Sequence, residues 1–404
     1  MRLPVLLPGH QLHLLEGSRE MFPALVEAID AAQREVLLET YIFDFTGDGE
    51  AVATALLRAA TRGVSVQVLV DGFGSGLLSE PWRRRMAQAG VRWQVYAPLG
   101  SLGVAWPGSW RRLHRKLCVI DNEIGFCGGI NILDDLHDPN HGALDSPRLD
   151  FSVQVRGPLV ADIAQAVRQA LARQDRLHAL RPQQVAEAIR RTGAVFTRPA
   201  DEPEMDGHAD PGSVRAALVL RDNLIHRSEI ERAYLRAIGQ AREEVIIANA
   251  YFVPGRRLRQ ALERAARRGV RVVLLLQGRY EYFMQYYASR PVYESLLAAG
   301  VDIHEYSPSF LHAKVAVIDG EWATVGSSNL DPLSLLLARE ANVVVQDRPF
   351  ASQLRARLLA AIAQHGQVMS PARFGRRPWR QRVLERLALG LMRLLLAIQG
   401  KRYL

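Results

Sequence analysis

The sequence predicts an α/β fold with two pseudo-symmetric lobes that share one site at their interface. Three observations predict it. A pattern of His, Lys and Asp occurs twice in the 404 residues, apolar strand-like runs alternate with helix-like runs around each copy, and a segment rich in acid, Pro and Gly separates the halves. Alternating strands and helices favour layered α/β units, and this length can bury the core of one large or two medium domains.

The two copies of the pattern keep the same spacing. In each, His precedes Lys by two residues, Asp by seven, Gly by fourteen and Asn by seventeen. The residues are His114, Lys116, Asp121, Gly128 and Asn131 in the first copy and His312, Lys314, Asp319, Gly326 and Asn329 in the second. A single His-x-Lys pair on a strand is more often a surface or structural feature, but repetition with intact spacing favours a functional site.

This spacing indicates the chemistry. Side chains at i and i+2 of a strand share a face, so each His and Lys share a pocket, whereas each Asp faces away and is interpreted as structural. Tight turns at Asp121-Asn122 and Asp319-Gly320 would return the chain so that Gly-x-x-Asn brings backbone and an amide donor to a bound group. Two His, two Lys and two Asn across a pseudo-twofold interface predict a nucleophile, a general acid and a cradle for phosphate.

Each half repeats more than this pattern. A dense apolar run predicts a buried strand, a helix ending at Gly leads into a second strand, and a third strand precedes the histidine. The matched segments are 36–43 with 245–252, 56–70 with 262–276, and 89–98 with 299–308. The expected divisions are an N-terminal lobe over 1–200, a linker over 201–212, a C-terminal lobe over 213–370 and a basic amphipathic helix over 371–404.

The repeated motif resembles the two HKD motifs of the phospholipase D superfamily. GGIN in the first half, and SFLHAKVAVID with TVGSSNLDPLSL in the second, are most similar to bacterial B-type cardiolipin synthases, over roughly residues 10 to 350. The resemblance implies two phospholipase D-like α/β/α sandwich lobes and a phosphatidyltransferase. Because the lysines and asparagines of the motifs would hold the phosphoryl oxygens, we expect no metal or cofactor. The resemblance places the whole motif in the catalytic set, namely His114, Lys116, Asp121, His312, Lys314 and Asp319.

Further positions complete the expected site. A carboxylate follows each motif in a strand-like run, Asp150 and then Glu340, and in the superfamily such a residue supports each catalytic His. A surface acid at a strand end is the alternative interpretation. The expected phosphate-binding residues are Asn131, Asn329 and Ser327. Because the first copy has Gly129 where the second has Ser327, a hydroxyl contact would come from the second half alone.

These assignments predict a cardiolipin synthase that transfers a phosphatidyl group from phosphatidylglycerol or phosphatidylethanolamine to phosphatidylglycerol. His114 would attack phosphorus while His312 protonates the leaving alcohol, and His312 would then deprotonate the incoming hydroxyl. Pseudo-symmetry leaves the order of the histidines open, and the resemblance favours His114 as nucleophile. Alternatives are hydrolysis to phosphatidic acid, a nuclease of the same superfamily, or a non-catalytic membrane scaffold, although the intact motifs argue against the last.

Charge and the final segment favour a membrane partner. A net charge of +9 suits anionic lipid or nucleic acid. The last helix is expected to carry an apolar stripe of Val383, Leu384, Leu387, Leu391, Leu394, Leu395 and Ile398 opposite Arg382, Glu385, Arg386 and Arg393. Such a helix suits an anionic membrane surface, and packing on its own domain is the alternative.

No apolar run is long enough to span a bilayer or to act as a signal peptide. We therefore expect a peripheral protein on the cytoplasmic face of the bacterial inner membrane, in contact with phosphatidylglycerol, phosphatidylethanolamine and cardiolipin, and no nucleic acid partner. An insertion over about 99–112 with two Trp suits a loop touching lipid or a packed lid. An aromatic run over 280–287 suits a lipid cleft or base stacking.

Two residue pairs suggest other chemistry. Cys118 and Cys127 would face each other across a two-residue turn, yet buried free thiols are the expected state. His137 and His141 lie in a loop rich in Asp, Asn, Pro and Gly with no Cys nearby, so we expect no metal site there.

Overall fold

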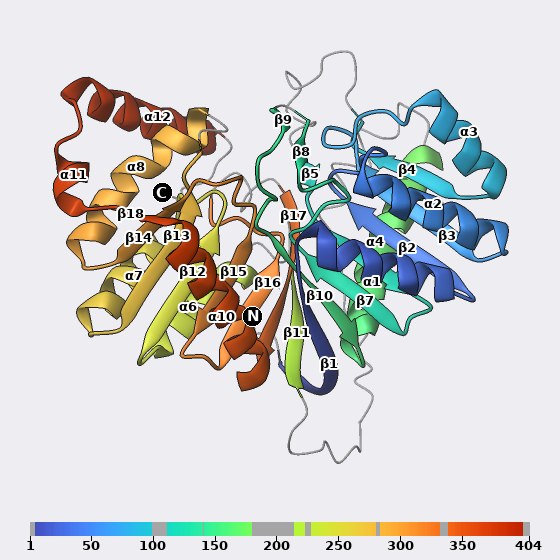
Figure 1. Cartoon of the computed structure of the whole chain (residues 1–404), viewed down its shortest axis with the longest axis horizontal. Coiled ribbons are helices and arrows are strands. Elements are labelled where there is room, and N and C mark those ends of the chain that lie inside the picture. Colours follow the sequence, from blue (N-terminus) through green and yellow to red (C-terminus); the bar gives the residue numbers. More distant parts are fainter. Residues whose placement is uncertain are drawn as a thin grey trace.

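The computed structural model describes residues 5–98, 111–139, 141–179, 214–222, 228–279, 283–331 and 338–398. Two lobes of similar architecture lie side by side, each a sheet with helices on both faces (Figure 1). The predicted α/β class and two-lobed arrangement are confirmed. The expected linker over 201–212 and nearly all of the insertion over 99–112 lie outside the described residues.

The N-terminal lobe contains fourteen described elements. They are β1 (Leu7–Glu16), α1 (Gly17–Ala31), β2 (Glu35–Thr40), α2 (Asp48–Thr61), β3 (Ser65–Asp71), α3 (Glu80–Ala89), β4 (Arg92–Tyr96), β5 (Arg112–Leu113), β6 (Leu117–Ile120), β7 (Ile124–Gly128), β8 (His137–Asp138), β9 (Gly142–Ala143), β10 (Phe151–Arg156) and α4 (Leu159–Ala179). The apolar runs predicted near residues 36 and 64 form the parallel pair β2 and β3, with α2 between them in the chain.

The C-terminal lobe repeats this order. Its described elements are β11 (Val214–Arg221), α6 (Glu229–Gln240), β12 (Glu244–Asn249), α7 (Arg256–Arg267), β13 (Arg271–Gln277), α8 (Phe283–Ala298), β14 (Asp302–Tyr306), β15 (Lys314–Ile318), β16 (Trp322–Gly326), β17 (Ala338–Gln346), α10 (Arg348–His365), β18 (Gly366–Val368), α11 (Pro371–Gly375) and α12 (Trp379–Ile398). Parallel strands β12, β13 and β14 correspond to β2, β3 and β4.

One continuous sheet crosses both lobes. Its main path runs β18-β14-β13-β12-β15-β16-β17-β11-β1-β10-β7-β6-β2-β3-β4. The first strands of the two lobes, β1 and β11, pair antiparallel at the centre (Figure 1). In each lobe the hairpin that follows the HxK sequence, β6–β7 or β15–β16, lies between the parallel strands and this central seam. Both motifs therefore lie close to the boundary between the lobes.

The arrangement of the core explains why the strands are unbroken apolar runs in the sequence. One apolar cluster passes through both lobes and joins strand residues such as Leu14, Phe151 and Val343 to α4 and α10. On the other face, separate clusters lie beneath α1 and α2 in one lobe and beneath α6, α7 and α8 in the other. Strands buried on both faces need apolar side chains at nearly every position. The shared cluster holds the lobes together as one packed unit.

The first hairpin corrects the expected turn. Ile120 pairs with Ile124, so three residues rather than two form the loop, and Cys118 pairs with Phe126 instead of Cys127. Because this shift moves side chains to opposite faces, the two cysteines pack in different apolar clusters. Both are buried free thiols, as expected.

The last helix is present, and it packs on its own lobe through residues outside the predicted apolar stripe. α12 packs against α8 through Ala388, Leu389 and Met392, whereas the predicted apolar stripe is exposed wherever its side chains are described. Glu385, expected on the polar face, is buried and forms an ion pair with Arg377. Among the described helices, none combines the length and the apolar composition needed to span a bilayer.

Candidate active site

The backbone brings each HxK sequence to the carboxylate of the opposite lobe. β5 pairs parallel with the start of β17, and the N–H of His114 donates to the carbonyl of Arg339 at 3.0 Å. Likewise, the N–H of His312 donates to the carbonyl of Leu149 at 2.9 Å. Because Glu340 follows Arg339 and Asp150 follows Leu149, the pairing of imidazoles with carboxylates crosses between the lobes.

His114 is held as a neutral imidazole. Its Nδ1 lies 3.1 Å from Oε2 of Glu340 and 3.2 Å from the carbonyl oxygen of Ser327. Both neighbours are acceptors, so Nδ1 carries the proton and Nε2 carries the lone pair. Burial lowers the pKa of His114, and Lys116 adds to this effect while Glu340 opposes it. A neutral imidazole with its Nε2 lone pair available is the form that a nucleophile needs.

His312 forms the second buried pair. Its Nδ1 lies 2.6 Å from Oδ2 of Asp150. Burial lowers the pKa of His312 well below its usual value, and the cations Lys314 and Lys116 lower it further. Burial also raises the pKa of Asp150 to about 7, against the opposing effect of Lys314. The His312–Asp150 pair can therefore gain or lose one proton near neutral pH, as general acid and base catalysis requires.

The two motif lysines lie in the same buried region. Nζ of Lys116 donates to the carbonyl of His114 at 2.7 Å, and Nζ of Lys314 donates to the carbonyl of His312. Burial, followed by repulsion from Lys314, lowers the pKa of Lys116 to about 7. A bound anion would relieve this repulsion. The ring centroids of His114 and His312 are 6.5 Å apart, a separation that accommodates one tetrahedral phosphate between them.

Comparisons with known proteins identify the family of this chain. The family model "Cardiolipin synthase, PLD-like domain" matches residues 25–143 and 234–361, more than half of the chain. The chain is 41% identical over 371 residues to cardiolipin synthase B of Salmonella typhimurium and, equally, to that of Escherichia coli, with 92% of this chain and 85% of each relative covered. The chain belongs to the phospholipase D-like cardiolipin synthase family.

A solved structure shows the same fold. The phosphatidylserine synthase of Haemophilus influenzae superimposes with a TM-score of 0.69 over 99% of this chain and 97% of that one, at 14% identity. At this identity the likeness concerns the fold alone. Family membership makes the chain a phosphatidyltransferase of the phospholipase D type.

The structure places Ser327 differently from the expected phosphate contact. Its Oγ donates to Oε2 of Glu340 at 2.6 Å and accepts from the N–H of Ala341 at 3.1 Å. The hydroxyl thus helps to orient the carboxylate that holds His114. Gly129, at the equivalent position, has no room for a side chain because an added Cβ would lie 2.3 Å from Oδ1 of Asp150.

Both motif asparagines are buried near the histidines' hairpins. Oδ1 of Asn131 accepts from the N–H of Ile42 at 3.1 Å, so Nδ2 is the end that can donate to an anion. Asn329 is 2% exposed and follows β16 in the same way that Asn131 follows β7. Their assignment to phosphate binding stays a prediction.

The motif aspartates lie at the far ends of the hairpins, away from the histidines, which corrects their place in the catalytic set. Asp121 accepts the backbone N–H groups of residues 33–35, and Asp319 accepts those of residues 242–244. Desolvation would raise the pKa of Asp121, but these N–H donors outweigh it and lower the pKa. Each aspartate ties a hairpin turn to the start of a parallel strand, which agrees with the structural interpretation.

Sequence reasoning missed Tyr41. The ring centroid of Tyr41 lies 5.0 Å from that of His114, and Nζ of Lys116 lies 5.4 Å from the centroid of the Tyr41 ring. Tyr41 directly follows β2, whose antiparallel neighbour β6 follows Lys116. Binding sites in α/β proteins usually lie at the carboxyl ends of parallel strands. The position of Tyr41 at the end of the predicted strand could therefore have identified it as a site residue. The ring of Tyr41 lies beside both His114 and Lys116.

In the loop that contains His137 and His141, the polar side chains bind one another. Nδ1 of His141 lies 3.0 Å from Oδ1 of Asp138, whose Oδ2 accepts from Arg148 at 2.8 Å. Among the described residues no cluster of three or more His, Cys, Asp or Glu side chains is arranged to hold a metal ion.

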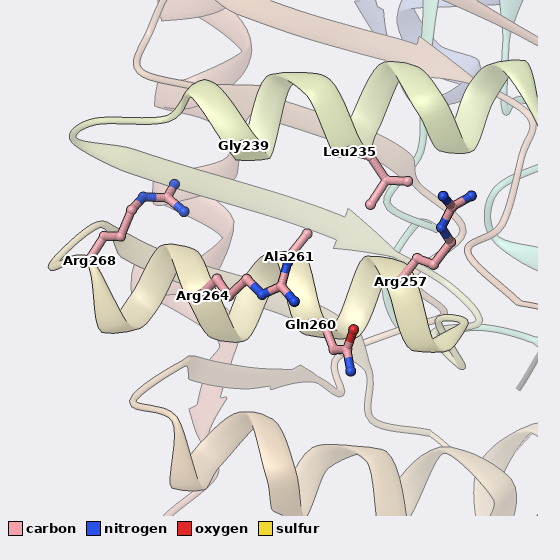
Figure 2. A pocket seen from close by; sticks show the side chains of 7 residues that line it. All are labelled: Leu235, Gly239, Arg257, Gln260, Ala261, Arg264 and Arg268. Atoms are coloured by element: carbon pink, nitrogen blue, oxygen red, sulfur yellow. The ribbon is translucent and has the colours of Figure 1, made fainter.

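A shallow groove of about 350 Å³ between α6 and α7 is separate from this site. Its lining residues are Leu235, Gly239, Arg257, Gln260, Ala261, Arg264 and Arg268. Figure 2 shows the arginines spread along α7 rather than gathered around one point. The groove contains no residue of the two HKD motifs.

Proposed function

We propose that this protein synthesises cardiolipin by transferring a phosphatidyl group to phosphatidylglycerol through a covalent phosphohistidine. The crossed pairs His114–Glu340 and His312–Asp150 carry the proposal, because they supply one imidazole held neutral and one that exchanges a proton near neutral pH. The donor would be phosphatidylglycerol or phosphatidylethanolamine, and the protein would act at the cytoplasmic face of the bacterial inner membrane.

The first half-reaction forms the covalent intermediate. Nε2 of His114 attacks phosphorus, the bond from phosphorus to the leaving alcohol breaks, and Nε2 of His312 gives its proton to that alcohol's oxygen. Glu340 stabilises the positive charge that develops on the His114 ring. Lys116 and Lys314 stabilise the negative charge on the phosphoryl oxygens in the transition state.

The second half-reaction reverses these roles. A free glycerol hydroxyl of phosphatidylglycerol attacks phosphorus and gives its proton to Nε2 of His312, the new oxygen–phosphorus bond forms, and the bond to His114 breaks. The products are cardiolipin and regenerated His114. Water at the same position would yield phosphatidic acid instead, so exclusion of water decides between transfer and hydrolysis.

Product analysis tests the proposal. Purified protein is incubated with isotopically labelled phosphatidylglycerol in detergent micelles, with and without phosphatidylethanolamine, and lipids are identified by mass spectrometry. Labelled cardiolipin is the expected product. Phosphatidic acid alone would show a hydrolase and contradict the transfer step. Absence of any lipid product, combined with cleavage of single-stranded DNA, would identify a nuclease instead.

The two perturbed groups predict a rate maximum close to neutral pH. In the second half-reaction the His312–Asp150 pair must be deprotonated to accept the proton of the incoming hydroxyl, so this step becomes faster as pH increases through the pKa of Asp150, about 7. Lys116, with its pKa lowered to about 7, must be charged to bind phosphate, so the rate falls as pH increases further. We expect kcat/KM for cardiolipin formation to decrease on both sides of pH ~7.

Lys116→Arg provides the control for the alkaline side. Arginine keeps its charge at every accessible pH, so the fall above neutrality should move to higher pH even if the maximal rate is lower. An unchanged alkaline limb in this variant would contradict the assignment of that limb to Lys116.

A further inference from the structure

α12 exposes a row of large apolar side chains to solvent. They are Trp379, Val383, Leu384, Leu387, Leu391 and Leu394. Leu387 and Leu391 are 64% and 47% exposed, although they occupy the centre of the stripe. Spacings of three and four residues place these side chains on one side of the helix. A continuous exposed apolar surface of this kind marks a binding surface.

The opposite face of the helix is anchored. Ala388, Leu389 and Met392 are buried against the lobe, where α12 packs on α8, and Glu385 is buried in its ion pair with Arg377. Turning the stripe inward would expose these apolar groups and break the buried ion pair, which is costly. The stripe therefore faces outward as a consequence of how α12 is packed.

Charges beside the stripe select the partner. Arg382, Arg386 and Arg393 are exposed and, at spacings of four and seven residues, form a row along one flank of the stripe. The one acidic side chain of α12, Glu385, is buried and already paired. An apolar stripe with an uncompensated row of arginines complements an anionic lipid surface. Two copies of the same cationic surface would repel each other.

α12 lies at the same end of the molecule as the strand that leads into His114 (Figure 1). Figure 1 shows α12 at the upper end, together with β5 and the β8–β9 hairpin. His114 follows β5 directly, and its ring centroid lies 6.5 Å from that of His312, so the proposed site belongs to this end. A membrane contacting α12 would therefore meet the end of the protein that receives lipid.

We propose that α12 is a membrane-docking helix: its apolar stripe inserts among the acyl chains of an anionic bilayer while Arg382, Arg386 and Arg393 contact the headgroups. The choice of a phospholipid bilayer as partner rests on the proposed function, whereas the exposure and charge of the helix do not depend on it.

Vesicle binding tests the docking helix. The test variant is Leu387→Ser/Leu391→Ser. The control is Val5→Ser/Leu7→Ser, which changes two exposed apolar side chains, 70% and 48% exposed, just before and at the start of β1. On vesicles of phosphatidylglycerol in phosphatidylcholine, we expect the α12 variant to partition about 100-fold more weakly, about tenfold for each leucine. The control should bind like the unmodified protein.

A charge variant separates the two contributions. Arg382→Gln/Arg386→Gln/Arg393→Gln should bind phosphatidylglycerol vesicles about 100-fold more weakly at low salt, at about fivefold per arginine, and should bind pure phosphatidylcholine vesicles unchanged. Equal loss on both kinds of vesicle would contradict headgroup recognition by these arginines.

Parallel measurements distinguish this inference from the proposed function. All variants should keep cardiolipin formation in detergent micelles, where bilayer docking is not needed, and should show unchanged thermal unfolding. Unaltered vesicle binding by Leu387→Ser/Leu391→Ser would overturn the docking helix, and its conversion of a dimer into a monomer would assign the stripe to a second copy. Binding through α12 without any cardiolipin product would leave the inference standing and refute the proposed function.

Discussion

Replacing His114 with alanine is expected to lower cardiolipin formation by about 10⁴-fold or more, with little effect on folding. The substitution removes the atom that bonds to phosphorus, so the covalent route is lost and only positioning by the lysines and asparagines remains. The imidazole is partly accessible, and its Nδ1 contacts Glu340 and the carbonyl oxygen of Ser327. Initial rates of labelled cardiolipin formation, together with thermal unfolding, measure both parts of this prediction.

His13→Ala is the matched control, because His13 is an exposed histidine on β1 outside both motifs. It should retain the full rate. If His114→Ala kept more than about one hundredth of the activity, a direct displacement without the covalent intermediate would replace the proposed route.

Replacing His312 with alanine should block the natural reaction to a similar extent but leave formation of the covalent intermediate intact for one class of donor. A phosphatidyl ester of p-nitrophenol has a leaving group that departs without a proton, so general acid catalysis is not needed for its release. His312→Ala should therefore release one equivalent of nitrophenolate per protein in a rapid burst. The second half-reaction should then stall, because no base remains to activate the acceptor hydroxyl.

Mass spectrometry of the stalled variant would locate the adduct. A phosphatidyl group on His114 is the expected result, and His114→Ala should give no burst. A burst in His114→Ala and none in His312→Ala would exchange the two roles. This experiment resolves the order that the pseudo-symmetric sequence left open.

Several parts of the fold could be predicted because they depend on local patterns. Dense apolar runs predicted strands such as β2 and β12. The spacing of apolar residues in such runs differs from the spacing in an amphipathic helix, so the two kinds of element can be told apart. Repetition of the HKD motif predicted one shared site. The odd offset of Asp121 from His114 predicted that its carboxylate would face away, and the structure places it on three backbone N–H groups.

Other parts depended on contacts between distant segments. A shift of one residue in the first hairpin separated Cys118 from Cys127, because a three-residue loop changes which residues are opposite. The helical pattern of α12 correctly predicted that its large apolar side chains lie along one side of the helix. It could not show which face would be buried, because that depends on the shape of α8.

The sequence by itself determined the two motifs, their chemistry and the α/β class, because these follow from residue types at fixed spacings along the chain. Only the tertiary structure decided that His114 pairs with Glu340 and His312 with Asp150, and that Ser327 orients Glu340. These pairings come from β5 meeting β17, and Leu311 meeting Leu149, across the lobe boundary. Such contacts join segments roughly 160 to 230 residues apart, and the sequence carries no periodic signal across that distance.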